Sequence, residues 1–153
     1  MAKLKLLLDT NILVDYLHRR TPFYQPARLL MMIGYVGDAE LWISSSQATD
    51  LIYILSDGGK AKEMPRVLKT LRGIRQFVNV YATGEAEIDK ALLTSWADPE
   101  DALLYEIALS LKVDAIVSRN ASDFEENIIP VVAGDELLDE LARRGIVYEE
   151  LLC

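Results

Sequence analysis

Four aspartates stand at positions from which a carboxylate could take part in chemistry: Asp9, Asp50, Asp101 and Asp123. Asp9 comes directly after a short apolar run, and Asp123 follows another such run by a few residues. Mg²⁺ and Mn²⁺ prefer oxygen ligands, which carboxylates supply in proteins. If the fold brings these side chains together, they would form a site for a divalent cation.

Each aspartate also has a purely structural explanation. Asp9 and Asp123 could cap helices, since an aspartate before an amphipathic helix accepts hydrogen bonds from free backbone N–H groups. Asp101 lies three residues after Asp98 and could complete a capping box. Asp50 could simply face solvent. Because the chain has 24 acidic residues, some will look well placed by chance. Spacing alone leaves the structural and the chemical explanations open.

Small hydrogen-bonding side chains accompany Asp9 and Asp123: Thr10, Asn11, Ser118 and Asn120. Such side chains orient the ligands and bound water of a metal site. Their presence favours the chemical explanation.

The types of residue present limit what kind of metal the protein could hold. The sequence contains one histidine, His18, and one cysteine, Cys153, so a structural zinc site and a disulfide framework are both excluded.

No apolar run approaches the length of a membrane span, and no stretch resembles a signal peptide. We expect a single cytoplasmic domain over residues 1–153.

Apolar runs and amphipathic stretches alternate along the chain. Strands are predicted at 6–8, 40–44, 76–81, 113–118 and 128–132, and helices at 10–20, 24–36, 48–55, 60–75, 84–96, 99–112 and 135–144. This alternation predicts a three-layer α/β domain built on a parallel sheet of five short strands. Ligands of such sheets bind at the carboxyl ends of the strands, where Asp9 would lie.

Four blocks of sequence resemble the signature blocks of PIN-domain nucleases, and they occur in the family's order: 9–13, 45–50, 98–102 and 118–124. The resemblance covers essentially the whole chain. The layout is most similar to single-domain bacterial and archaeal members, including the VapC-type toxins of toxin–antitoxin pairs.

The resemblance implies a sheet in the order 3-2-1-4-5 and a Mg²⁺- or Mn²⁺-dependent ribonuclease. It implies four catalytic carboxylates (Asp9, Asp50, Asp101 and Asp123), with metal bound by the first, third and fourth. Thr10, Asn11, Ser118 and Asn120 match the polar supporting positions. The family more often has glutamate where this chain has Asp50, so that shorter side chain would reach a metal through water.

RNA binding requires positive charge away from an acidic site. The net charge is −8, but residues 60–75 carry +5, leaving −13 for the rest of the chain. The predicted RNA contacts are Lys62, Arg66, Lys69, Arg72 and Arg119, although a basic helix can also be a solvated face. Four tyrosines at helical spacing are interpreted as core packing rather than as platforms for bases: Tyr16, Tyr35, Tyr53 and Tyr105.

The expected partners are RNA, an antitoxin protein and a second copy of the chain in a homodimer. One alternative is a PIN-fold module with weak catalysis that binds RNA or protein. A receiver or haloacid-dehalogenase domain also has an aspartate after its first strand. However, Asn11 stands where a dehalogenase has a second aspartate, and residues 130–134 lack the lysine of a receiver.

Overall fold

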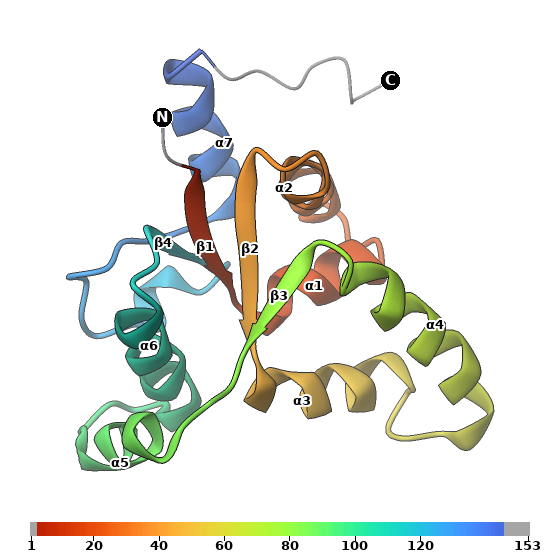
Figure 1. Cartoon of the computed structure of the whole chain (residues 1–153), viewed down its shortest axis with the longest axis horizontal. Coiled ribbons are helices and arrows are strands. Elements are labelled where there is room, and N and C mark those ends of the chain that lie inside the picture. The colour runs from red at the N-terminus through yellow and green to blue at the C-terminus, as the bar shows by residue number, and fades with distance from the viewer. Residues whose placement is uncertain (1–2, 146–153) are drawn as a thin grey trace.

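The chain forms a parallel sheet whose strands lie in the order β3-β2-β1-β4-β5, which confirms the predicted fold (Figure 1). A computed structural model describes residues 3–145. Its strands are β1 (Leu4–Leu8), β2 (Ala39–Ser44), β3 (Val78–Tyr81), β4 (Ala115–Val117) and β5 (Val131–Val132). The strand with Asp9 at its end is therefore the central one.

Seven α-helices and two 3₁₀ turns lie between or after the strands within residues 3–145. The α-helices are α1 (Thr10–Leu17), α2 (Tyr24–Tyr35), α3 (Ser45–Leu55), α4 (Met64–Ile74), α5 (Glu85–Leu93), α6 (Pro99–Leu111) and α7 (Gly134–Arg143). The 3₁₀ turns are η1 (Ala61–Glu63) and η2 (Ala121–Asp123). None of these helices is long and apolar enough to cross a membrane.

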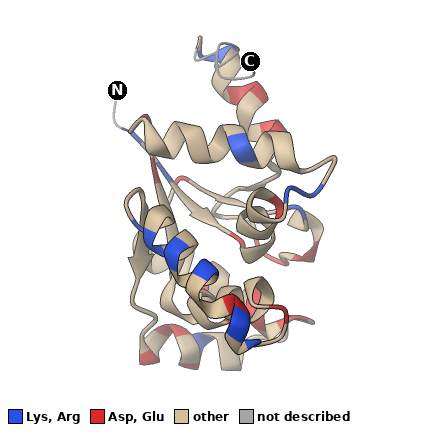
Figure 2. Cartoon of the chain, turned by 90° about the vertical axis from the view of Figure 1, so that its right-hand side faces the viewer, with Lys and Arg blue, Asp and Glu red and all other residues tan. Residues whose placement is uncertain are grey.

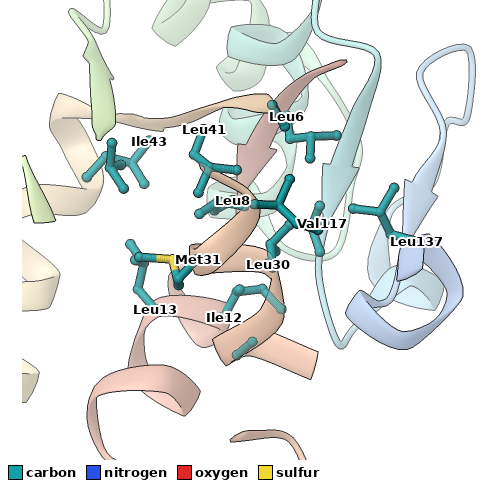
Figure 3. Packing of buried hydrophobic residues seen from close by; sticks show 14 of the residues in the cluster. Leu6, Leu8, Ile12, Leu13, Leu30, Met31, Leu41, Ile43, Val117 and Leu137 are labelled. Carbon is teal, nitrogen blue, oxygen red and sulfur yellow. The ribbon is translucent and has the colours of Figure 1, made fainter. Parts of the chain in front are cut away.

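Two apolar cores lie on opposite faces of the sheet. Alternate side chains of a strand point to opposite faces, so Leu6 and Leu8 pack with α1, α2 and α7, while Leu7 packs with α6. Figure 3 shows the first core around Leu8, Leu13 and Leu30. The predicted three layers are thus helices, sheet and helices, and α5 packs outside α6.

Several predicted element boundaries differ from the structure. Helix α1 ends at Leu17 instead of residue 20, and Arg19 has a φ of 50°, which a continuing right-handed helix does not allow. The basic segment begins with η1 before α4 starts at Met64. Leu68 of α4 is 41% exposed, because the core side of this helix is formed by Val67 and Ile74.

Candidate active site

A cleft of about 500 Å³ opens where β1 and β2 end, between α3 and α6. Three of the four predicted aspartates line it: Asp9, Asp50 and Asp101. Asp123 does not line it. The other lining residues are Thr10, Ser44, Ser46, Gln47, Tyr53, Ile54, Glu100, Leu103 and Leu104. The fold thus brings carboxylates from three distant parts of the sequence to one space.

Asp9 caps a helix and faces the cleft at the same time. One carboxylate oxygen accepts the N–H of Thr10 at 2.7 Å, and the other accepts the hydroxyl of Ser118 at 2.7 Å. Burial raises the pKa of Asp9, and these two hydrogen bonds act in the opposite direction. The capping and chemical explanations of this residue are therefore compatible.

Ser118 is itself held in place by the loop that follows β4. Its oxygen accepts the N–H of Asn120 at 3.0 Å. Asn11 reaches the same loop through a 3.5 Å contact between its side-chain oxygen and the N–H of Arg119. Three of the predicted supporting residues thus join the end of β4 to the start of α1.

Asp101 lies in the first turn of α6 and has the largest pKa shift of the predicted site residues. Asp98 caps this helix by accepting the N–H groups of Glu100 at 2.9 Å and Asp101 at 3.4 Å. Burial, followed by the charges of Asp98, Asp9, Asp123 and Glu100, raises the pKa of Asp101 to about 7. The negative charge of Asp123 thus acts on Asp101, although Asp123 lies outside the cleft lining.

The described carboxylates do not form a complete set of metal ligands in this structure. Asp123 ends η2 and Asp50 lies on α3, and both are exposed. Among residues 3–145, no three His, Cys, Asp or Glu side chains lie close enough together to hold an ion. The donor chemistry nevertheless fits Mg²⁺ or Mn²⁺, because carboxylates and hydroxyls gather in the lining of one cleft.

Gln47 joins α3 to the end of β1 and the start of α1, a role that we did not predict. Its side-chain nitrogen donates to the carbonyl of Leu8 at 2.8 Å and to the Thr10 hydroxyl at 3.2 Å. Its side-chain oxygen accepts the N–H of Ser44 at 2.7 Å in the capping box of α3. The helix that carries Asp50 is therefore tied directly to β1. The spacing from Ser44 to Gln47 signals the capping box but not the second contact.

A buried ion pair lies behind the loop after β4. Arg119 donates from Nε to Asp15 of α1 at 2.6 Å, and its guanidinium lies 4.2 Å from the centre of the Phe23 ring. The Asp15 side chain is 1% exposed, and its second oxygen has no hydrogen-bond partner among the described residues. Arg119, a predicted RNA contact, thus holds the loop that carries Ser118.

The remaining predicted RNA contacts lie on η1 and α4, and Figure 2 shows several Lys and Arg positions (blue) along the ribbon of this side of the molecule. Lys62, Lys69 and Arg72 are exposed. Arg66 is also exposed, but it pairs with Glu63 at 3.1 Å and donates to the carbonyl of Leu55 at 3.0 Å. Lys60 pairs with Asp57, so the exposed charge of this segment lies mainly in Lys62, Lys69 and Arg72.

The interpretation of the four tyrosines as core residues is wrong for two of them. Tyr105 is buried and packs with the α6 core, and Tyr16 is half-buried. Tyr53 and Tyr35 are 63% and 67% exposed. Helical spacing could not distinguish these cases, because an apolar stripe can extend past the edge of the helix face that a neighbour covers.

Comparison with known proteins agrees with the fold. One solved structure, described as a toxin–antitoxin complex from Klebsiella pneumoniae, has a TM-score of 0.62 at 20% identity, covering 84% of this chain and 97% of that chain. A second, VapBC2 from Rickettsia felis bound to a DNA fragment from their promoter, has a TM-score of 0.58 at 16% identity, with the same coverage. No curated protein matches the sequence. The family model for the PIN domain matches residues 5–122, and the chain therefore belongs to the PIN domain family.

Proposed function

We propose that this protein is a metal-dependent ribonuclease that hydrolyses phosphodiester bonds of RNA at the cleft. The observation that carries the proposal is the cleft in which Asp9, Asp50 and Asp101 meet from distant parts of the sequence. Negative groups held near one another in this way favour binding of a divalent cation, which removes their repulsion. Membership of the PIN domain family supports the same activity.

In this proposal Asp9, Asp101 and Asp123 would hold Mg²⁺ or Mn²⁺, and Asp50 would take part through water. The ion would supply an activated water and neutralise charge at the phosphate. Ser118 keeps the Asp9 carboxylate oriented through its 2.7 Å hydrogen bond. Thr10, Asn11 and Asn120 would support this arrangement through the contacts between α1, α3 and the loop after β4.

Attraction of RNA would come from the basic segment, residues 60–75, which carries +5 against the acidic rest of the chain. Lys62, Lys69 and Arg72 are the main contacts in this proposal, with Arg66 and Arg119 contributing where their ion pairs leave donors available. Binding through these side chains would weaken steeply with salt, because phosphate contacts release condensed cations.

The cellular role that we propose is that of a toxin that acts in the cytoplasm and is held by an antitoxin protein. The similar structures are described as a toxin–antitoxin complex and as VapBC2 on promoter DNA, which supports this role. A homodimer is also part of the proposal.

Cleavage of single-stranded RNA with added Mg²⁺ or Mn²⁺ tests the proposed activity. We expect cleavage by the parent protein, loss of cleavage with EDTA, and loss with Asp101→Asn. Asp89→Asn is the matched control, because this exposed aspartate lies on α5 away from the cleft. Equal cleavage by the parent and Asp101→Asn would contradict the proposal.

A second candidate is a module that binds RNA or protein with little catalysis. It is favoured by the lack, among residues 3–145, of three potential ligands close enough to hold an ion. Calorimetric titration with Mn²⁺ separates the two candidates. Binding of Mn²⁺ that Asp101→Asn weakens supports the ribonuclease, whereas RNA binding without any Mn²⁺ binding supports the module.

A further inference from the structure

Tyr53 is a large aromatic side chain on the wall of the cleft that no other ring covers. It lines the cleft together with Asp50 and Asp101, and it is 63% exposed. Several aromatic side chains of the described residues pair with one another, as Tyr16 does with Tyr24 and Trp96 with Tyr105, whereas Tyr53 makes no such ring contact within this part of the chain. Its ring is therefore available to a ligand of the cleft.

The position of Tyr53 on α3 places its ring beside the acidic part of the cleft. Residues three apart lie on the same face of a helix, so Tyr53 and Asp50 are neighbours on the surface of α3. Apolar side chains adjoin them in the cleft lining: Ile54, Leu103 and Leu104. One end of the cleft thus offers carboxylates, and the adjoining wall offers an aromatic ring with aliphatic neighbours.

Two glycines after α3, Gly58 and Gly59, lie against the Tyr53 ring. A Cβ atom on Gly58 would lie 3.7 Å from the Tyr53 hydroxyl oxygen, and one on Gly59 would lie 4.0 Å from the ring. Both glycines have positive φ, 83° and 90°, which side chains other than glycine rarely adopt. The turn therefore packs against the phenol without covering it with side chains.

We propose that Tyr53 is the stacking platform for a nucleobase next to the phosphodiester that is cut, a proposal that rests on the function proposed above. A base presents a flat face that stacks on an aromatic ring, whatever its identity. Its phosphate would then lie on the side of Asp50 and Asp101. A base within a duplex is covered on both faces, so the site selects RNA that is unpaired at the cut.

Binding of RNA to protein that cannot cut it tests this proposal. In an Asp101→Asn background with Mg²⁺ present, we expect Tyr53→Ala to weaken binding of a labelled single-stranded oligonucleotide by roughly 5- to 100-fold. Tyr53→Phe keeps the ring and should bind like the background protein. Tyr35→Ala is the matched control, because Tyr35 is equally exposed but lies on α2 outside the cleft.

A second oligonucleotide shows whether the lost contact is with a base. An abasic strand keeps the sugar–phosphate chain, so Tyr53→Ala should leave its affinity unchanged. Equal losses for the normal and abasic strands, or no loss for either, would overturn the stacking proposal and leave the ribonuclease intact. If the background protein binds neither strand and the parent does not cut RNA, the proposed function and the stacking proposal are both wrong.

Discussion

Replacing Asp101 by asparagine should make the metal-free protein more stable while it removes activity. The carboxylate of Asp101 is partly buried among Asp9, Asp98, Glu100 and Asp123, and its pKa is raised to about 7. An amide of the same shape occupies the position without charge. The folded state of the variant is therefore free of the cost of burying a charge, and of the repulsion by neighbouring carboxylates, that the parent protein must bear when no cation is bound.

The size of this gain follows from the pKa of Asp101. The pKa rises from 3.8 to about 7 on folding, and each pKa unit corresponds to about 1.4 kcal/mol, which sets a ceiling of about 4 kcal/mol. Asp101 keeps part of its surface in water, and solvent screens its neighbours. A gain of about 1–2 kcal/mol in the free energy of unfolding is therefore expected at neutral pH.

The gain should depend on pH in a defined direction. Between pH 3.8 and about 7, the folded parent keeps the Asp101 proton that the unfolded chain has released. The parent therefore loses stability as the pH rises through this window, and the asparagine variant lacks this loss. The difference should be small below pH 4 and complete above pH 7.

Urea unfolding in EDTA at several pH values between 4 and 8 measures this difference. The control is Asp89→Asn, which lies outside the cleft and should change stability little at any pH. Addition of Mg²⁺ should reduce the gain, because a bound cation stabilises the parent. If Asp101→Asn is no more stable than the parent at pH 8 in EDTA, the inferred concentration of negative charge is wrong.

Two further predictions concern the loop after β4. Ser118→Ala removes a hydrogen bond that lowers the pKa of Asp9. Mn²⁺ titrations of this variant should show about 10- to 100-fold weaker binding, and the pH midpoint of binding should shift upward. Unchanged Mn²⁺ binding would exclude a supporting role for Ser118. Arg119→Met leaves Asp15 buried without its partner and should cost about 3–5 kcal/mol in urea unfolding. The double variant with Asp15→Leu should recover most of that loss, and a double variant as unstable as Arg119→Met would contradict this account.

The fold was predictable because its main signals are local. Leu6, Leu7 and Leu8 form a run without polar interruption, and the structure buries all three in the central strand. Asp98 followed by Pro99 marks the start of α6 in the sequence, and the side chain of Asp98 caps that helix. The two aspartates at element boundaries, Asp9 and Asp101, could be found in the same way.

The contacts that could not be predicted join residues far apart in the sequence. Asp15 and Arg119 are 104 positions apart, so neither the charge of a helix nor that of a loop indicates their pairing. The same holds for Gln47, whose second contact is with the backbone of β1. The exposure of Tyr53 depends on which neighbour covers α3, and periodicity carries no information about that neighbour.

The central position of β1 has a consequence for hydrogen exchange at the cleft. Asp9 directly follows β1, which is paired with a strand on each side. The amides of β1 should therefore exchange with solvent only when the whole sheet opens. Asp50 belongs to α3, which Gln47 ties to Leu8 of that strand, and Asp101 belongs to α6, which packs against Leu7 on one face of the sheet. The amides that flank Asp9 should therefore be the most strongly protected from hydrogen exchange in the site.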